Sequence, residues 1–336
     1  MSIVLDAMGS DHYPDPEVQA AVDAARDFGE EIILVGNREI VEPKLAALNP
    51  GSLPIRIVHA AQIVGMTDKA VASTVAKPDN SMAIGLSLVK NGEAKAFVTA
   101  GNSGAAFFNA VTTLRRMDGV RRPAMIVPIP TRTGRCLLID NGANADCRPE
   151  FLEEFALMGS LYAQRSLGIS NPRVGLLSNG EEAGKGNQLV KDAYKLLEHS
   201  QLNFYGNIEP KELFAGEADV VVTDGFTGNI FIKTSEAVAS LITSILKEEM
   251  TASFTRKLGA LLVKPAFGRL KTMLDPNEVG AAILLGVNGY VFIGHGRSNA
   301  RALYNAIRNA REAVKSNLLE TLPADLAAKV SSSTIP

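Results

Sequence analysis

The sequence has few cysteines, no tryptophan and little net charge. Its two cysteines, Cys136 and Cys147, are too few for a disulfide framework, so we expect reduced thiols in an intracellular protein. A net charge of -2 provides no global attraction for nucleic acid, and none is expected as a partner. No apolar run reaches the length of about 18 residues that a spanning helix needs. The apolar start, which Asp6 interrupts, predicts a strand rather than a signal peptide.

Several motifs of cofactor binding and catalysis are also missing. No G-x-G-x-x-G follows the first predicted strand, which argues against a dinucleotide site. The sequence has no G-x-S-x-G elbow, so an acyl-serine hydrolase is not indicated. The four histidines, at positions 12, 59, 199 and 295, lack the spacing of metal ligands. We therefore expect no metal and no cofactor.

What the sequence does contain is an alternation of short apolar runs with amphipathic stretches. Predicted strands lie at residues 3–5, 31–35, 55–58, 96–99, 125–129, 136–139, 173–177, 219–223 and 290–293. Predicted helices lie at residues 16–28, 82–90, 149–167, 187–199 and 226–250. Apolar strands separated by helices indicate an α/β fold with a doubly wound, mostly parallel sheet covered by helices on both faces. We expect a single domain over residues 1–330 and a flexible tail at 331–336.

Five predicted strands are followed by segments rich in Gly, Asn, Asp and Ser. These segments are residues 6–12, 100–105, 140–144, 178–187 and 224–229. Any one of them is compatible with a plain turn, because Gly and Asn adopt positive φ at low cost. Taken together, they favour a crevice at the carboxyl ends of the strands, where backbone N–H groups bind an anionic substrate.

Lys185 is the most informative charge in these segments because it stands between Gly184 and Gly186 at a predicted helix start. A phosphate there would meet an ammonium group and several N–H dipoles. The segment differs from a nucleotide-binding P-loop, since it is one residue short and lacks the Ser or Thr that binds magnesium. The alternative is a solvated lysine on a turn. His12 and His295 also stand beside loop glycines and are candidates for lining the site.

Residues 251–274 contain five basic residues and no acidic residue. Apolar side chains at Phe254, Leu258, Leu261 and Leu262 share one helical face, and Pro265 is expected to interrupt the helix. This pattern is typical of an interfacial helix on anionic lipid. A helical hairpin buried in a dimer interface and a docking surface for an acidic protein are the alternatives.

The ordered set of motifs resembles the PlsX-type acyl-carrier-protein:phosphate acyltransferases over residues 3 to about 315. The segments that carry the resemblance are LDAMGSD from residue 5, KPDNSM from 77, TAGNSGA from 99, RRPA from 121, DNGANADCRPE from 140, VGLLSNGEEAGKGN from 174, NFYGNIEP from 203, DVVVTDGFTGNIFIKTSE from 219 and GVNGYVFIGHGRS from 286. The resemblance implies a fold similar to phosphotransacetylases and isocitrate-type dehydrogenases, with a protruding helical arm at about residues 236–275.

The resemblance also implies a reaction and a set of partners. An acyl group passes from acyl carrier protein to inorganic phosphate, and the acyl phosphate enters phospholipid synthesis. The family implies a homodimer in the cytoplasm, peripheral contact with the inner face of the plasma membrane, and an integral glycerol-3-phosphate acyltransferase that consumes the product. Residues 251–274 are our candidate for the membrane contact. The arginines at 115, 116, 121 and 122 are our candidate for carrier docking.

On this resemblance, Lys185 and Asn229 are the candidate catalytic residues, stabilising phosphate or the developing oxyanion. The other candidates for binding phosphate or substrate, or for ordering the loops that do so, are Gly9, His12, Asn102, Ser103, Gly104, Asp140, Asn144, Asn207, Asp224 and Gly228. The main alternative is a phosphotransacetylase that uses short acyl-CoA. A hydroxyacid dehydrogenase with NAD and a non-catalytic membrane scaffold are weaker alternatives.

Overall fold

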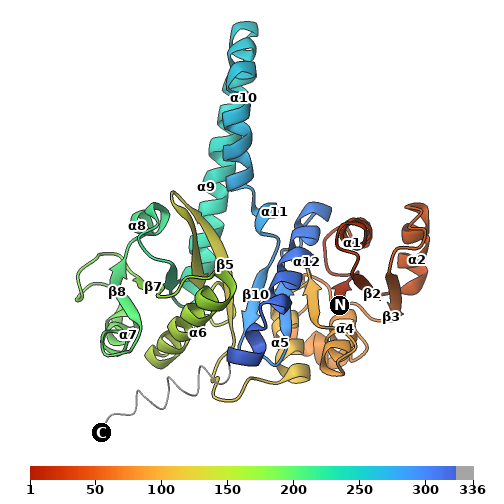
Figure 1. Ribbon diagram of the computed structural model, residues 1–336, viewed down its shortest axis with the longest axis horizontal. Helices are drawn as coiled ribbons and strands as arrows, with labels where there is room; N and C mark the ends of the chain where they lie inside the picture. Colours follow the sequence, from red (N-terminus) through yellow and green to blue (C-terminus); the bar gives the residue numbers. More distant parts are fainter. Residues whose placement is uncertain (323–336) are drawn as a thin grey trace.

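The computed structural model describes residues 1–322, with the side chains of 264–267 and 269–271 outside the description. The predicted single domain of residues 1–330 and the predicted flexible tail of residues 331–336 therefore reach beyond the described part. Residues 1–322 build one continuous sheet with helices around it (Figure 1).

The sheet has eleven strands in the order β3-β2-β1-β4-β11-β10-β5-β6-β9-β7-β8. The strands are β1 (Ser2–Asp6), β2 (Glu31–Gly36), β3 (Ile55–His59), β4 (Ala96–Thr99), β5 (Ala124–Thr131), β6 (Gly134–Ile139), β7 (Arg173–Leu177), β8 (Asn203–Ile208), β9 (Val220–Val222), β10 (Ala282–Leu285) and β11 (Tyr290–Ile293). Most pairings are parallel, and the antiparallel ones are β11–β10, β10–β5 and β5–β6. The predicted mostly parallel sheet is confirmed.

These three antiparallel pairings reverse the direction of the sheet. Strands β1, β2, β3, β4 and β11 run one way, and β6, β7, β8 and β9 run the other way. The carboxyl ends of the first group form what we call the arm-side edge, and those of the second group form the far edge. Parallel strands within each group bring their following loops together, as in other α/β folds.

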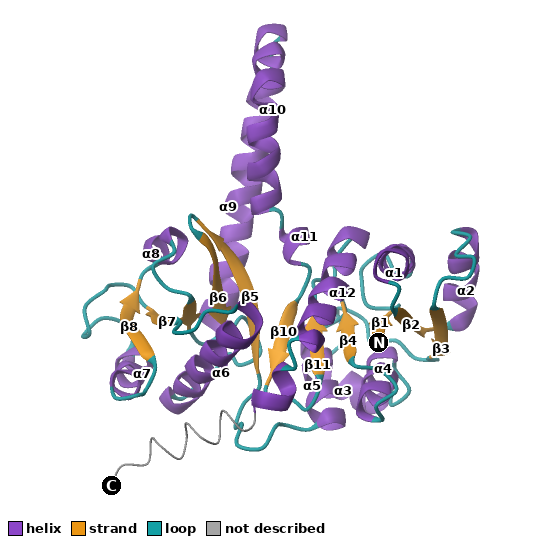
Figure 2. Ribbon diagram, viewed as in Figure 1, coloured by secondary structure: helices purple, strands orange, loops and turns teal. Residues whose placement is uncertain are grey.

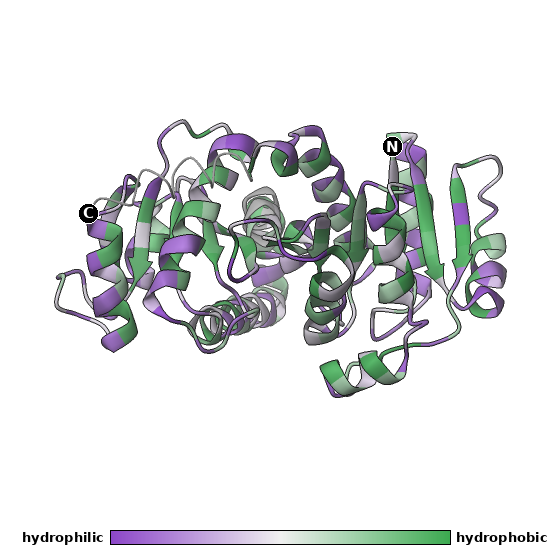
Figure 3. Ribbon diagram, turned by 90° about the horizontal axis from the view of Figure 1, so that it is seen from below, coloured by the Kyte–Doolittle hydropathy of each residue, from purple (hydrophilic) through white to green (hydrophobic). Residues whose placement is uncertain are grey.

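Helices cover both faces of the sheet (Figure 3). They are α1 (Asp15–Phe28), α2 (Arg38–Ala47), α3 (Ala70–Ala76), α4 (Ser81–Lys90), α5 (Ser103–Leu114), α6 (Pro149–Leu167), α7 (Gln188–Glu198), α8 (Pro210–Ala215), α9 (Gly225–Thr251), α10 (Phe254–Leu274), α11 (Pro276–Val279) and α12 (Ala300–Lys315). On one face a single hydrophobic cluster lies beneath α1, α12 and α6. On the other face one cluster lies beneath α4 and α5, and a smaller one beneath α8 and α9.

The boundaries of α6 show how local residues define a helix. It begins at Pro149, whose missing N–H costs nothing in the first turn, and it ends at Gly168, whose φ of 70° is left-handed. These two signals account for the agreement with the predicted range. The sequence analysis did not predict β8, whose six residues include two asparagines and a glycine, or the four-residue β10, nor several helices, among them α2, α5 and α12.

Helices α9 and α10 form a hairpin that projects from the body (Figure 2). The predicted protruding arm is confirmed. The predicted interruption at position 265 is wrong, because α10 continues as a helix through that position. A proline removes one backbone hydrogen bond, and the contacts between α10 and α9 offset this loss. Within residues 1–322, no helix combines the length and apolarity that crossing a membrane requires.

Glu17 gives the fold a testable dependence on pH. Its carboxylate is buried and accepts a hydrogen bond of 2.9 Å from the Ser10 backbone N–H, and burial raises its pKa from 4.5 to about 7. Between these values the folded protein holds a proton that the unfolded chain has lost. Stability from this group is therefore present below pH 4.5 and falls, by at most about 3 kcal/mol, as the pH rises through 7.

We expect Glu17→Gln to remove this loss, because glutamine preserves the acceptor and does not titrate. The measurement is the free energy of unfolding by urea between pH 5 and 8, compared with the wild type. The exposed Glu93 supplies the control, and Glu93→Gln should leave the pH dependence as it is. Equal slopes for the wild type and Glu17→Gln would contradict the assignment.

Candidate active site

At the far edge, Asp140 organises the loop that follows β6. Its buried carboxylate accepts hydrogen bonds from the backbone N–H groups of Met125, Ala143 and Asn144, and from the Asn144 side-chain amide. Burial raises the pKa of Asp140, and these hydrogen bonds oppose that shift. Asn144 also donates to the Pro123 carbonyl at 2.8 Å. All the described acceptor bonds of Asp140 lead into its own loop and the start of β5, so its role is to order the loop.

The start of α9 packs against this loop. Asp224 caps the helix by accepting from the Thr227 backbone N–H at 2.9 Å and from the Thr227 hydroxyl at 2.7 Å. Gly228 faces the loop so closely that a Cβ there would lie 2.0 Å from the Asp140 carbonyl oxygen. One residue later, Asn229 donates to the Asn141 carbonyl at 3.2 Å. These contacts bring Asp140, Asn144, Asp224, Gly228 and Asn229 together.

The loop after β7 carries Lys185 at the same edge. Asn207 on β8 holds this loop by donating to the Glu182 carbonyl at 2.8 Å, and the Lys185 backbone N–H donates to the same carbonyl. The Lys185 stem lies against Gly180, where a Cβ would be 2.7 Å from the lysine Cγ. Lys185 itself is exposed, and its ammonium group has no hydrogen bond or ion pair within residues 1–322. It is therefore available to an anion.

Three buried side-chain oxygens at the far edge have no hydrogen-bond partner in the described part of the chain. They are Ser178 Oγ, Asn207 Oδ1 and Asn141 Oδ1. Ser178 lies beside Gly186, since a Cβ on that glycine would be 3.3 Å from the Ser178 hydroxyl. Buried polar atoms are rarely left unpaired, so each oxygen has a ligand or an ordered water as its natural partner.

At the arm-side edge, Asp6 and Thr99 join the loops after β1 and β4. The Thr99 hydroxyl donates to Asp6 at 2.7 Å and accepts from the Gly101 backbone N–H at 2.9 Å. Burial raises the pKa of Asp6. Gly9 packs into the same junction, where a Cβ would lie 2.8 Å from the Gly101 backbone nitrogen. Gly9 is thus required for the close approach of two backbones.

Asn102 uses its polar atoms within the protein rather than presenting them to a ligand. Its Oδ1 accepts from the Ala105 backbone N–H and caps α5. Its amide nitrogen, with two N–H donors, faces the carbonyls of Gly65 at 3.5 Å, Met66 at 3.1 Å and Asp68 at 3.2 Å. Direct binding of phosphate by this side chain is therefore not supported. The neighbouring Ser103 and Gly104 are exposed in the first turn of α5, and His12 is exposed on the turn after β1.

A pocket of about 710 Å³ lies between the arm-side loops and α9. The loops contribute Asp11, Met66 and residues 295–297. The helix contributes Lys233, Glu236, Ala237, Ser240, Leu241 and Ser244. The pocket therefore has charged groups near Lys233 and Glu236, and small polar and apolar side chains alternate farther along α9.

Four charged residues of this pocket, Asp11, Lys233, Glu236 and Arg297, were not among the predicted site residues, although all lie inside the quoted motifs. Glu236 forms an ion pair of 2.5 Å with Arg297, and its other oxygen lies 3.8 Å from His295. Partial desolvation lowers the pKa of His295, although its side chain is still 53% exposed, and the Glu236 carboxylate opposes this shift. Lys233 follows Asn229 by one helical turn on α9. Its i+4 spacing from Asn229 is the sequence signal that could have identified it.

The two edges correct one expectation. We expected all five polar loops to line a single crevice, but the reversal of the sheet separates the loops after β6, β7 and β9 from those after β1 and β4. Helix α9 connects the two groups, since it starts at the far edge and passes the pocket at the arm-side edge.

Neither cysteine has the environment of a nucleophile. Burial raises the pKa of Cys136 and of Cys147 to about 12, so both are thiols at neutral pH. A group of carboxylates, Glu181, Glu209 and Glu212, comes close enough to hold a cation. The Lys211 ammonium already lies 2.8 to 3.1 Å from an oxygen of each, and it neutralises part of their charge.

Gly228 offers a test of the far-edge geometry. We expect Gly228→Ala to push α9 away from the Asp140 loop, to destabilise the protein by about 2 kcal/mol and to lower activity. Gly259 on α10 is the matched control, because a Cβ there meets nothing within 4 Å, and Gly259→Ala should stabilise by about 0.5 to 1 kcal/mol. Thermal unfolding and turnover of both variants would check this. Normal stability and turnover of Gly228→Ala would refute the tight contact.

The chain is similar to known proteins over nearly its whole length. The family model described as "Fatty acid synthesis protein" matches residues 1–321. The phosphate acyltransferase of Acidobacterium capsulatum is 45% identical over 331 residues, with 98% of each chain covered. That of Geobacter sulfurreducens is 44% identical over 322 residues, covering 96% of this chain and 93% of the relative.

Solved structures share the fold at low sequence identity. A phosphotransacetylase from Streptococcus pyogenes superposes with a TM-score of 0.60 and 20% identity, covering 94% of each chain. A 4-hydroxythreonine-4-phosphate dehydrogenase from Klebsiella pneumoniae superposes with a TM-score of 0.57 and 15% identity, covering 93% of this chain and 98% of that one. The predicted likeness to phosphotransacetylases is confirmed at the level of the fold. The family match and the identity to curated relatives show that this chain belongs to the phosphate acyltransferases, enzymes that transfer acyl groups.

Proposed function

We propose that the protein transfers a fatty acyl group from acyl carrier protein to inorganic phosphate and that the reaction takes place at the far edge of the sheet. The observation that carries this assignment is the exposed, unpaired Lys185 on a glycine-rich loop. The buried Ser178 hydroxyl, which has no partner among the described residues, can donate at the same edge, and the capped start of α9 places the Asn229 side-chain amide there. An ammonium group beside such donors suits a phosphate dianion.

The reaction needs positioning more than covalent chemistry. A phosphate oxygen attacks the thioester carbonyl, a C–O bond forms, and the carbonyl oxygen becomes an oxyanion. When the C–S bond breaks, the sulfur leaves as a thiolate and takes a proton from water. A thiol with a pKa of about 8.5 is a good leaving group and needs little acid assistance. In this proposal Lys185 holds phosphate, and Asn229 donates to the oxyanion after exchanging its bond to Asn141.

The environment of the cysteines supports direct attack by phosphate. An acyl-enzyme on sulfur would need a thiolate, and burial holds the pKa of both cysteines near 12. The buried carboxylates Asp140 and Asp6 are committed to hydrogen bonds within their loops. Phosphate then supplies the nucleophile itself.

An exposed group of arginines supports carrier docking beside this site. Arg115, Arg116, Arg121 and Arg122 precede β5 at the far edge. Glu154 accepts from the backbone N–H groups of Arg121 and Arg122 and so fixes this segment. Pro123 joins it to the Asp140 loop through Asn144. An acidic carrier protein bound there would present its thioester arm to the far edge.

We expect Lys185→Ala to lower acyl-phosphate formation by about 100-fold or more, because an ammonium aimed at developing charge is lost. The measurement is turnover of acyl carrier protein and phosphate, with thermal unfolding to show that the variant folds. Lys195 is also exposed but lies on α7 and pairs with Asp192, so Lys195→Ala should be fully active. Near-normal turnover of Lys185→Ala would refute its role.

The alternative function is a phosphotransacetylase acting on short acyl-CoA. The solved phosphotransacetylases support it through the fold alone. The assay that separates the two compares acetyl-CoA with palmitoyl carrier protein at saturating phosphate. A preference for acetyl-CoA would overturn the proposed substrate.

The tip of the arm supports peripheral contact with a membrane. Phe254, Leu258, Leu261 and Leu262 are 83%, 59%, 63% and 81% exposed, and they form an apolar patch on α10. Large exposed apolar patches mark sites of contact with lipid or protein. Each basic residue near anionic lipid adds about 1 kcal/mol. Contact with a second copy of the chain is the alternative use of this face, and we include a homodimer and an integral acyltransferase partner in the proposal.

We expect Leu258→Glu/Leu262→Glu to abolish flotation with vesicles of anionic phospholipid, because two charges would enter the apolar patch. The control is Leu258→Met/Leu262→Met, which preserves the apolar face and should bind as the wild type does. Gel filtration of the same variants tests the dimer. Unchanged flotation of the glutamate variant would refute the membrane assignment, and a change in size alone would favour the dimer interface.

A further inference from the structure

Met66 projects from the loop between β3 and α3 into the pocket beside α9. The residue is 43% exposed, and its methyl group lies against Gly296 on the loop after β11. A Cβ at Gly296 would come within 2.7 Å of Met66 Cε and 2.8 Å of an Asp11 oxygen. The methionine thus closes one wall of the pocket, opposite Ala237 and Leu241 of α9.

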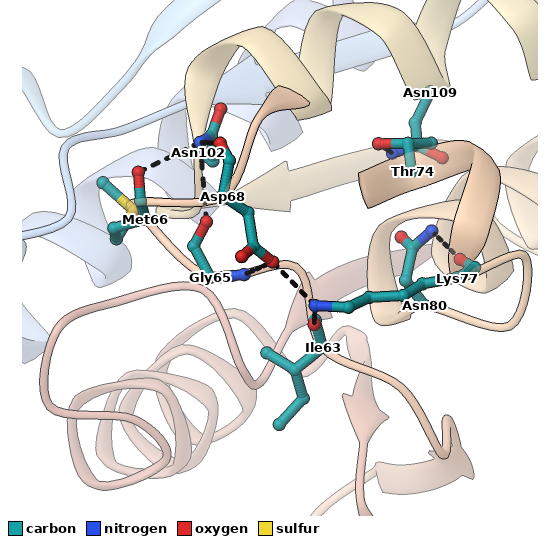
Figure 4. A network of polar contacts seen from close by, with 9 residues as sticks. All are labelled: Ile63, Gly65, Met66, Asp68, Thr74, Lys77, Asn80, Asn102 and Asn109. Atoms are coloured by element: carbon teal, nitrogen blue, oxygen red, sulfur yellow. Dashed lines mark hydrogen bonds and ion pairs between the residues drawn. The ribbon is translucent and has the colours of Figure 1, made fainter. Parts of the chain in front are cut away.

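The shape of this loop depends on three side chains rather than on regular structure (Figure 4). Asp68 accepts from the Gly65 backbone N–H at 2.9 Å and from the Lys77 ammonium at 2.6 Å. Lys77 also donates to the Ile63 carbonyl at 2.7 Å, and Asn102 faces the carbonyls of Gly65, Met66 and Asp68. Side chains therefore satisfy the polar backbone of the loop on both sides of Met66.

The loop is also tied at its ends. Val64 is buried in the cluster beneath α4 and α5, so one end is held by the core. Helix α3 follows the loop and packs on α5, where the Asn109 side-chain amide donates a hydrogen bond of 3.4 Å to the Thr74 hydroxyl. The Lys77–Asp68 pair spans α3 from its C-cap to the loop before it. This ion pair therefore ties the loop that carries Met66 to the C-terminal end of α3.

The distance along α9 relates Met66 to the chemistry. From Asn229 to Leu241 the helix rises about 18 Å, which is comparable with an extended long acyl chain. If the acyl chain extends from Asn229 along α9, a short acyl group ends before the pocket residues opposite Met66, whereas a long one extends as far as Leu241. The thioether side chain is flexible and polarisable, which suits contact with a hydrocarbon chain.

We propose that Met66 is a specificity-determining residue that contacts the far end of a long acyl chain, and that Lys77 and Asp68 are positioning residues that hold it in the pocket wall. The inference rests on the proposed acyl transfer. Beyond that function, it states where the acyl chain lies and how the protein distinguishes acyl groups of different length.

The first experiment compares butyryl and palmitoyl carrier protein at saturating phosphate. Met66→Trp should lower kcat/KM for the palmitoyl substrate about tenfold more than for the butyryl one, because the indole fills the space of the distal chain. Val75→Trp is the matched control, since Val75 is 68% exposed on α3 and does not line the pocket. It should leave the ratio of the two substrates unchanged.

The second experiment tests the positioning role. Lys77→Met should raise KM for the palmitoyl substrate without changing KM for phosphate. Lys77→Arg preserves the positive charge and should have the wild-type KM for both. In a Met66→Ala background, Lys77→Met should cause no further change in the chain-length ratio, because its effect passes through Met66. A merely structural role would instead raise both KM values and lower the melting temperature together.

The outcomes separate the two proposals. A wild type that makes no acyl phosphate from either substrate overturns the proposed function and this inference with it. A wild type that is active, with the same chain-length ratio in folded Met66→Trp, overturns only the inference. An additive effect of Lys77→Met in the Met66→Ala background overturns the positioning role.

Discussion

The reversal of strand direction through β10 and β5 is the constraint on which the layout of the polar loops depends. Parallel pairing brings the loops after β6, β7 and β9 to one edge and those after β1, β4 and β11 to the other. Each edge is then fastened by one buried carboxylate, Asp140 or Asp6, that gathers the neighbouring donors. The energetic cost of burying these carboxylates is offset only when the loops adopt their observed shapes.

Helix α9 follows from this constraint. It begins at the far edge, where Gly225 and Gly228 allow its first turn to approach the Asp140 loop, and it runs past the arm-side loops into the arm. A single rigid helix therefore carries Asn229, the pocket residue Lys233 and the exposed apolar surface that leads to Phe254. The proposed reaction site and the arm therefore share one helix.

Much of the fold was predictable because its signals are local. The ranges of β4, β7, β11 and α6 agree with the prediction, since apolar runs and the Pro149 and Gly168 boundaries mark them. Strand β10 was missed because the five apolar residues between Gly280 and Gly286 are too few to tell a buried strand from a buried helical turn. The direction of each strand was not predictable, because it depends on how distant segments pair. For that reason the sequence located the polar loops after the strands but placed them in one group, whereas the sheet divides them between two edges.

The same argument distinguishes residues that shape the site from residues that are free to meet a ligand. The side chains of Asp140, Asn144 and Asn102 form hydrogen bonds with neighbouring backbone groups. A sequence motif does not distinguish such residues from residues that bind a ligand. By contrast, the Lys185 ammonium group, the Ser178 hydroxyl and the Asn207 side-chain oxygen have no hydrogen-bond partner among the described residues. In the proposed reaction both kinds of residue have a use, because a donor helps a transition state only when its position is fixed beforehand. On this proposal, the fixed loops limit where phosphate can lie, and the side chains without partners determine which groups it contacts there.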